Sequence, residues 1–154
     1  MLYALALIAG FVAGLRTFTA PAAVSWAARL GFLNLGGTGL AFMGYAWTPW
    51  IFTVLAIVEF VIDQLPSTPS RKVPAQFGAR LVSGALCGAT LGASVGGWIG
   101  GLIAGVVGAA VGTYGGAEVR ARMAEAFGRD LPAGAIEDAA AIVLGLFVVW
   151  AARV

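Results

Sequence analysis

Long apolar runs separated by short polar connections make up most of the chain. Four runs are plain, and they cover residues 46–62, 76–95, 97–116 and roughly 135–152. Another begins at the first residues and extends to residue 28, and no charged residue occurs anywhere over 81–117. Such runs reach the length of about 18 apolar residues that is typical of a transmembrane helix. The pattern predicts an all-α, polytopic integral membrane bundle of five or six spans that forms a single transmembrane domain, 1–154.

The first run allows two interpretations. A straight helix over residues 2–28 would be about 40 Å long at 1.5 Å per residue, whereas the hydrocarbon core is only about 30 Å thick. Either one long span is tilted and kinked at Pro21, or two shorter pieces break near Arg16 as a hairpin or a discontinuous helix. The number of spans and the side of the N-terminus depend on this choice. The segment lacks the basic start of a signal peptide, so we expect it to belong to the folded protein.

The charges in the connections predict an orientation. By the spacing of the runs, the stretches 63–75 and 117–134 lie on the same face, and they carry Arg71, Lys72, Arg120, Arg122 and Arg129. The excess of basic residues makes this face cytoplasmic by the positive-inside rule. The opposite face is expected to carry Arg29 and Arg153 together with four tryptophans, Trp47, Trp50, Trp98 and Trp150.

Small residues recur every fourth position over 76–116. One row is Gly84, Gly88, Gly92, Gly96 and Gly100, a second is Gly97, Gly101, Gly105 and Ala109, and a third is Ala104, Gly108, Gly112 and Gly116. Residues four apart share a helix face, and faces of small residues let two backbones approach closely in a membrane. The rows predict a glycine-zipper hairpin at 76–116. A row left over from that hairpin would instead serve a second subunit and make the protein a homo-oligomer.

Charged residues also occur within or beside the apolar runs, where each costs at least about 2.5–3.5 kcal/mol if it faces lipid. We therefore expect them to face the protein interior. With neighbouring threonines they form the candidate path for a substrate or an ion: Arg16, Thr17, Thr19, Glu59, Asp63, Arg80, Glu137 and Asp138. The natural pairings are Arg16 with Glu59, and Arg80 with Glu137 or Asp138. The pairs either fix helix register alone or line a polar pocket for a cation, a proton or an anion.

Composition narrows the function classes. Of the 154 residues, 60% are hydrophobic and 10% are charged, whereas a soluble domain carries about 25% charged residues. The net charge of +2 gives no reason to expect a nucleic-acid partner. The chain has no histidine, and Cys87 is its only cysteine. We expect no metal, no cofactor and no enzymatic activity, and we expect membrane lipid as the main partner.

Four fragments of the chain resemble a known family: "GLRTFTAPAAVSWAA", "IDQLPSTPSR", "ARLVSGALCGATLG" and "IEDAAAI". Together they are similar to the uncharacterised bacterial membrane family named domain-of-unknown-function 4126, from about residue 8 to about residue 145. The resemblance implies a small integral protein of the bacterial inner membrane that carries these charges. It implies no activity, so no functional residue is carried over from the family.

The sequence supports two main hypotheses of function. A third, an enzyme that acts on lipid, is the weakest. The first is a small transporter or channel whose path runs through the candidate residues. It predicts that they converge on a cavity that solvent reaches. The second is a structural or accessory membrane subunit that assembles through its glycine-rich faces. It predicts dry, fully paired charges and an apolar face for another protein.

Overall fold

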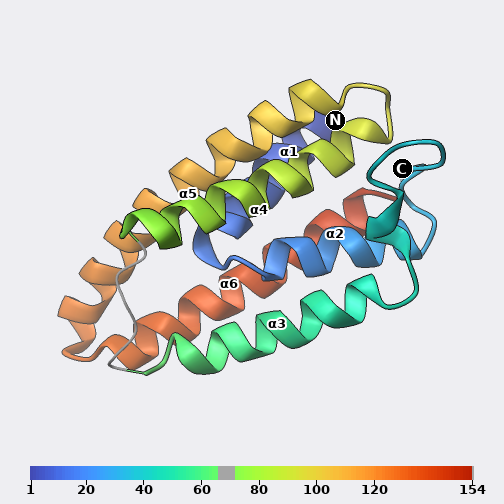
Figure 1. The fold of residues 1–154 in the computed structure, drawn as a ribbon. Helices are drawn as coiled ribbons and strands as arrows, with labels where there is room; N and C mark the ends of the chain where they lie inside the picture. Colours follow the sequence, from blue (N-terminus) through green and yellow to red (C-terminus); the bar gives the residue numbers. More distant parts are fainter. Residues whose placement is uncertain (66–71, 154) are drawn as a thin grey trace.

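The first apolar run is divided into two helices. The protein is described here by a computed structural model that covers residues 1–65 and 72–153. Helix α1 (Leu2–Leu15) ends where Arg16 adopts an extended conformation, with φ −140° and ψ 121°, and helix α2 (Thr19–Arg29) follows. Pro21 lies in the first turn of α2, where its missing N–H removes no intrahelical bond. The two helices run in opposite directions, so they form a hairpin and not one kinked helix (Figure 1).

Four longer helices follow in the chain. They are α3 (Thr48–Ile62), α4 (Pro74–Ala93), α5 (Trp98–Phe127) and α6 (Asp130–Ala151), and a short 3-10 helix, η1 (Ala41–Gly44), precedes them. Prolines begin α3 and α4, and Gly128 ends α5 with a φ of 64° that other residues rarely adopt. Within residues 1–65 and 72–153 there are six α-helices and no strand, which confirms the all-α prediction.

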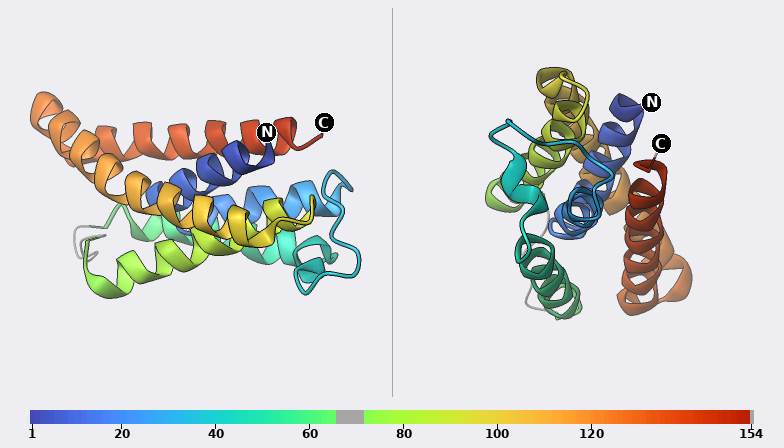
Figure 2. Two further views of the ribbon diagram at one scale, coloured as in Figure 1. Left: turned by 90° about the horizontal axis from the view of Figure 1, so that it is seen from above. Right: turned by 90° about the vertical axis from the view of Figure 1, so that its right-hand side faces the viewer.

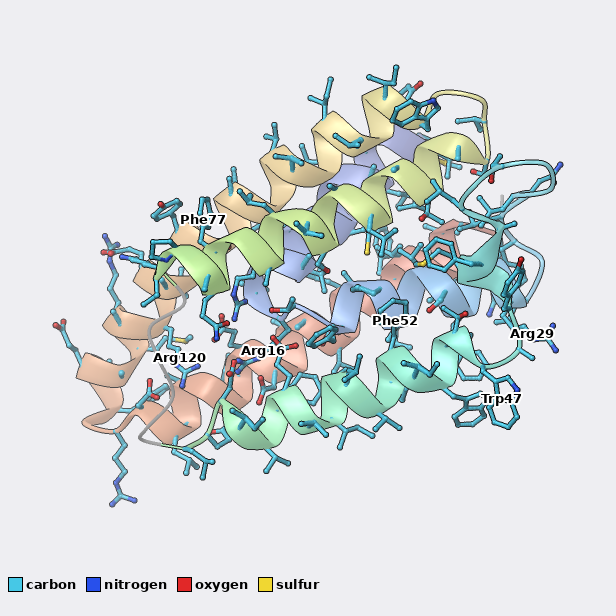
Figure 3. All side chains as sticks on the ribbon, in the orientation of Figure 1. Arg16, Arg29, Trp47, Phe52, Phe77 and Arg120 are labelled. Carbon is cyan, nitrogen blue, oxygen red and sulfur yellow. The ribbon has the colours of Figure 1, made fainter. Side chains whose placement is uncertain are left out.

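The helices lie side by side with alternating directions. Both chain termini, the loop after α2 and the α4–α5 turn lie at one end of the molecule, called here the terminal end (Figures 1 and 2). The end of α3, the start of α4 and the α5–α6 turn lie at the opposite end. Figure 3 shows Arg29 and Trp47 at the terminal end and Arg120 toward the opposite one. The arrangement therefore separates these residues as the sequence predicts.

Helices α1, α4 and α5 pack through glycines. A Cβ atom on Gly84 of α4 would lie 2.6 Å from the carbonyl oxygen of Gly105 in α5, so only glycine permits this approach. On an adjoining part of the same face α5 receives α1, because Gly108 and Gly112 lie against the backbone of Leu7 and Phe11. Most glycines of the rows thus face helices of the same chain, but Gly96 lies in the α4–α5 turn with a φ of 76° and interrupts the first row. The glycine rows therefore give no reason to infer a second subunit that binds an unused row. The packing of α1 against these glycines was not predicted.

Helix α5 is longer than the apolar run from which it was predicted. It contains 30 residues and continues without a break through residues 117–127, a polar stretch that is expected to be helical but separate from the apolar run. Gly115 and Gly116 do not end it, because a helical glycine costs only about 1 kcal/mol relative to alanine. The correction matters for the site, since it places Arg120 on a continuous helix.

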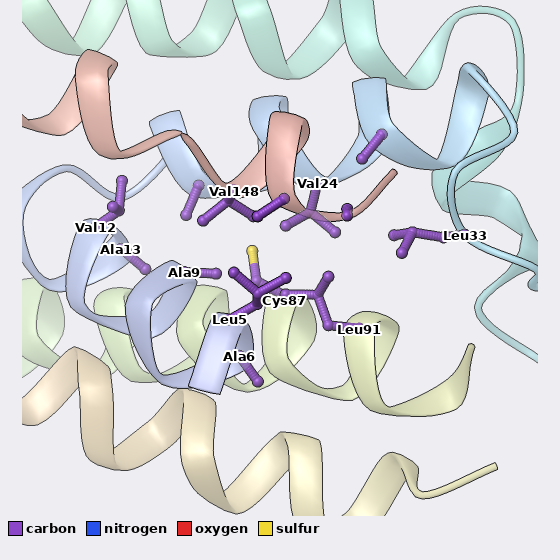
Figure 4. Close-up of a cluster of buried hydrophobic side chains, with 14 of the residues drawn as sticks. Leu5, Ala6, Ala9, Val12, Ala13, Val24, Leu33, Cys87, Leu91 and Val148 are labelled. Atoms are coloured by element: carbon purple, nitrogen blue, oxygen red, sulfur yellow. The ribbon is translucent and has the colours of Figure 1, made fainter. Parts of the chain in front are cut away.

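The apolar core lies between α1, α2, α4 and α6. Leu5, Ala9, Val24, Cys87 and Val148 meet there, each 3% exposed or less (Figure 4). Many of these residues are small, so the four helices approach closely and hold the α1–α2 hairpin inside the bundle.

Two of the described helices, α5 and α6, are long and apolar enough to cross a membrane. Helices α1 and α3 are also apolar but shorter, with 14 and 15 residues. By length and composition alone, the chain is therefore suited to associate with a membrane.

Candidate functional site

The turn between α1 and α2 leaves backbone groups without intrahelical partners inside the bundle. Arg80 of α4 satisfies the end of α1: its Nη1 donates to the carbonyl oxygens of Gly14, at 2.8 Å, and Leu15, at 2.6 Å. Ser83, one helical turn further along α4, donates its hydroxyl to the carbonyl of Thr17 at 2.5 Å. A positive charge thus lies at the C-terminal end of α1, where the helix dipole favours it.

Glu59 of α3 satisfies the other side of the same turn. Its two carboxylate oxygens accept the backbone N–H groups of Thr17, at 2.6 Å, and Phe18, at 2.9 Å. These are donors just before α2, where a negative charge is stabilising. The carboxylate also lies 3.9 Å from Nη2 of Arg80. Residues of α3 and α4 therefore clamp the turn from both sides.

The side chain of Arg16 extends from the turn into a second cluster of charged residues. It forms ion pairs with Asp63, after the end of α3, and Asp138 of α6; its Nε donates to Asp138 Oδ1 at 2.5 Å. These three side chains are called here the Arg16 triad. The Arg16 side chain is fully buried, whereas those of Asp63 and Asp138 are each 16% exposed. The guanidinium carbon lies 6.0 Å from the centre of the Phe60 ring.

Arg120 joins the site from the far part of α5. It donates to both carboxylate oxygens of Asp130, at 2.8 and 2.5 Å, and to Glu137 at 3.3 Å. Glu137 in turn lies 3.9 Å from Nη2 of Arg16, so the Arg120 group touches the Arg16 triad. Figure 3 shows Arg16 and Arg120 in the same half of the molecule.

The eight candidate residues all lie at or beside the α1–α2 turn, but two predicted pairings are wrong. Arg16 binds Asp63 and Asp138 instead of Glu59, whose oxygens are taken by backbone N–H groups. Glu59 is the acidic group beside Arg80, in place of Glu137 or Asp138. The hairpin explains both corrections: it turns the backbone of residues 14–18 toward α3 and α4 and sends the Arg16 side chain toward α6.

Sequence reasoning missed several members of the site. Arg120 was assigned to a connection, yet it follows Thr113 by seven residues and Gly116 by four, which places all three on one face of a helix. Thr113 is buried, and its hydroxyl donates to the carbonyl of Ala109 at 2.8 Å and lies 3.3 Å from the carbonyl oxygen of Gly14. Gln64 was also missed, and its amide donates to Asp138 Oδ2 at 3.1 Å. The helical spacing was a usable signal for Arg120, and none existed for Gln64.

Thr19 is a candidate residue with an unmet hydroxyl group. It is the first residue of α2 and 8% exposed, and its buried hydroxyl has no hydrogen-bond partner among the described residues. Three arginines and five carboxylates surround the turn within that part of the chain. No grouping of three His, Cys, Asp or Glu side chains that could hold a metal ion was found in it. Where one of these ion pairs opens, a carboxylate is free to bind a proton or another cation, and an arginine is free to bind an anion.

Comparison with known proteins yields one match. No curated protein and no solved structure is similar to this chain. The family described as "Domain of unknown function (DUF4126)" matches residues 3–153, which is nearly the whole chain and confirms the resemblance seen in the sequence. That description names no function. The chain belongs to the DUF4126 family.

Proposed function

We propose that the protein is a polytopic integral membrane protein of the bacterial inner membrane. Its outward surface supports this, because large apolar side chains are exposed along whole helices, among them Ile51, Val54, Val58, Val61, Ile103, Val107, Val111, Val143 and Phe147. Continuous exposed apolar surfaces mark contact with lipid or another protein. Orientation by basic residues then makes the end that holds the 117–134 segment cytoplasmic, together with the predicted connection 63–75, of which residues 66–71 lie outside the described part of the chain.

Within that membrane, the protein acts as a small transporter or channel for an ion or a small charged solute. One observation carries the proposal: an interrupted, buried backbone is held by ionisable side chains from the other helices. Broken helices are tolerated at membrane depth where they are buried in protein or line a cavity, and transporters bind their substrates at such breaks. Ionisable residues inside a membrane bundle are by default candidates for a substrate or proton path.

In the proposed transport path, the ion pairs of the Arg16 triad correspond to a closed state. Arg16 is fully buried between Asp63 and Asp138, and those two carboxylates retain some exposure. A cation or proton that reaches them competes with the guanidinium for the same oxygens. Movement of Arg16 away from one carboxylate opens the path without moving the α1–α2 turn, which Glu59 and Arg80 hold independently.

A second function is favoured by a different observation. The charges around the turn are largely buried and paired, which is what a structural or accessory subunit requires of groups that only fix helix positions. In that case the exposed apolar surfaces serve contact with another membrane protein. The glycine faces are not available for it, because α1, α4 and α5 occupy them.

Current measurements on proteoliposomes separate the two. The purified protein is tested over a panel of ions and small organic acids and amines, together with Asp138→Asn and the control Glu118→Gln. Glu118 is 58% exposed on α5 and pairs with Arg122, away from the turn. A substrate-dependent current that falls at least tenfold in Asp138→Asn and persists in Glu118→Gln supports transport. A silent wild-type protein that is folded and inserted in the vesicles favours the accessory subunit.

A further inference from the structure

We infer that the groove between α2, α3 and α6 binds a lipophilic organic cation, whose charge competes with Arg16 for Asp63 and Asp138. The inference rests on the proposed transport function and names the substrate class of the same site. It goes beyond the ion pairs described above, because it assigns a role to an apolar groove that the cluster itself does not use.

The groove has a floor and two walls. Helix α2 forms the floor, and α3 and α6, which both pack on α2, form the walls (Figure 2). Its volume is about 410 Å³, within the range of about 300–1,000 Å³ typical of small-molecule sites. Except for Thr19 and Thr53, its lining is apolar, and it opens on the side where the apolar residues of α3 and α6 are exposed. A ligand can therefore enter from the lipid.

Each row of lining residues leads to the Arg16 triad. On the floor, Trp26, Ala23 and Thr19 line the groove, and Thr19 begins α2 three residues after Arg16, which lies in the turn. On one wall the row of α3 ends at Phe60, three positions before Asp63. On the other wall Ile142 follows Asp138 by four. Residues three or four apart share a helix face, so the rows of α3 and α6, extended by about one turn, lead to Asp63 and Asp138, and Arg16 joins them from the turn before α2.

Two features at this inner end are suited to a ligand. The Thr19 hydroxyl is buried and has no partner among the described residues, which is unfavourable unless a ligand supplies a hydrogen bond. Phe60 lines the groove and lies 6.0 Å from the Arg16 guanidinium, so its ring is the boundary between groove and triad. The face of an aromatic ring attracts organic cations.

The charge of the triad selects a cation. Two carboxylates share one guanidinium, which leaves an excess of negative charge at the end of the groove. Both carboxylates are 16% exposed while Arg16 is fully buried, so the acidic groups are the more accessible part of the triad. A lipophilic anion of the same size would be repelled there. The groove supplies apolar contact, and the triad supplies the selection by charge.

The test uses two probes of one shape and opposite charge, tetraphenylphosphonium and tetraphenylborate. Binding to the full-length protein in lipid nanodiscs is measured by equilibrium dialysis, with empty nanodiscs subtracted. Gly145→Leu fills the groove, because a Cβ at Gly145 meets only Ala23 and Thr19 at ordinary distances of 3.5 and 3.7 Å. Gly115→Leu is the matched control, since a Cβ at Gly115 meets no atom within 4 Å. If Gly145→Leu does not fold, Ala23→Leu fills the same groove from the floor.

The expected result is saturable binding of tetraphenylphosphonium that weakens at least tenfold in Gly145→Leu and in Asp138→Asn, and less than twofold in Gly115→Leu. Tetraphenylborate should show no saturable binding. Equal binding of both probes, no binding of either, or undiminished binding in Gly145→Leu overturns the inference. Currents carried by small ions without phosphonium binding would refute the groove site and leave transport standing. Phosphonium binding in a protein that carries no current would retain the groove and refute transport.

Discussion

A single carboxylate decides the geometry of the α1–α2 turn. Glu59 presents two oxygens to two successive backbone N–H groups, those of Thr17 and Phe18. Each bond joins an ionised acceptor to a buried donor, and such bonds are stronger than neutral ones. The turn is therefore formed by a side chain from another helix, while its own residues make few bonds within it.

Glu59→Gln is expected to lower the free energy of unfolding by about 1–3 kcal/mol, because an amide offers one acceptor oxygen where the carboxylate offers two. One of the two N–H groups is then left unpaired in the bundle. Thermal unfolding in detergent measures the change. Glu118→Gln, at an exposed ion pair on α5, is expected to change stability by at most about 1 kcal/mol. Equal effects of the two substitutions would show that the Glu59 carboxylate is not needed at the turn.

At the scale of helices, α5 has a central place in the packing, because both α1 and α4 lie against its glycines. Gly105 lies against Gly10 of α1 and against Gly84 and Gly88 of α4, so three backbones meet at one position. Close backbone contact of this kind is a main source of helix association in lipid, because apolar side chains gain little by leaving one apolar phase for another. The α1–α2 turn is placed by this packing, since α1 is held to α5 along most of its length.

Gly105→Ala is expected to destabilise the protein by about 1–3 kcal/mol, because its Cβ would collide with the Gly84 carbonyl and force α4 away from α5. Gly115→Ala, in open space on the same helix, should be neutral or stabilising by up to about 1 kcal/mol. Unfolding temperatures of the two variants in one detergent make the comparison. A stable Gly105→Ala protein would contradict the packing of three backbones described here.

At the scale of the whole molecule, the termini and the charged turn lie toward opposite ends. Both termini and the 30–47 loop are at the terminal end, and the α1–α2 turn points toward the end where α5 meets α6 (Figures 1 and 2). In the proposed membrane orientation, the Arg16 triad then lies close to the cytoplasmic side. The groove extends from it toward the terminal end along α2.

This orientation predicts the labelling of single cysteines by a membrane-impermeant maleimide. In a Cys87→Ala background, Asn34→Cys and Arg129→Cys both place a thiol at an exposed position, and Arg129→Cys is expected to react only from the cytoplasmic side. Asn34→Cys should react only from the other side. Intact spheroplasts and inverted vesicles of the same cells give the two accessibilities. Helices α3, α4 and α5 lie between the two cysteines in the chain. Reaction of both thiols from one side would therefore be inconsistent with each of these three helices crossing the membrane.

Local patterns carried a good part of the information about this protein. Apolar runs without charge predicted the helices, since any helix in apolar surroundings must satisfy its backbone within itself. Pro21 and Arg16 in the first run predicted either a kink or a break, because a proline is favourable in a first turn and unfavourable in a helix interior. The eight candidate residues were also named from type and position alone, and they lie together around that break.

Only the tertiary structure decided which of these residues touch. The hairpin of α1 and α2 was one of several open interpretations, and once formed it exchanged the predicted partners of Arg16 and Arg80. It also brought Arg120 and Gln64 to the site and placed α1 against the glycines of α5. The sequence by itself determined the helices and the supply of charges, because helix formation and burial depend on local spacing. The pairing of charges depends on directions in space between helices far apart in the chain, and only the packed bundle sets those directions.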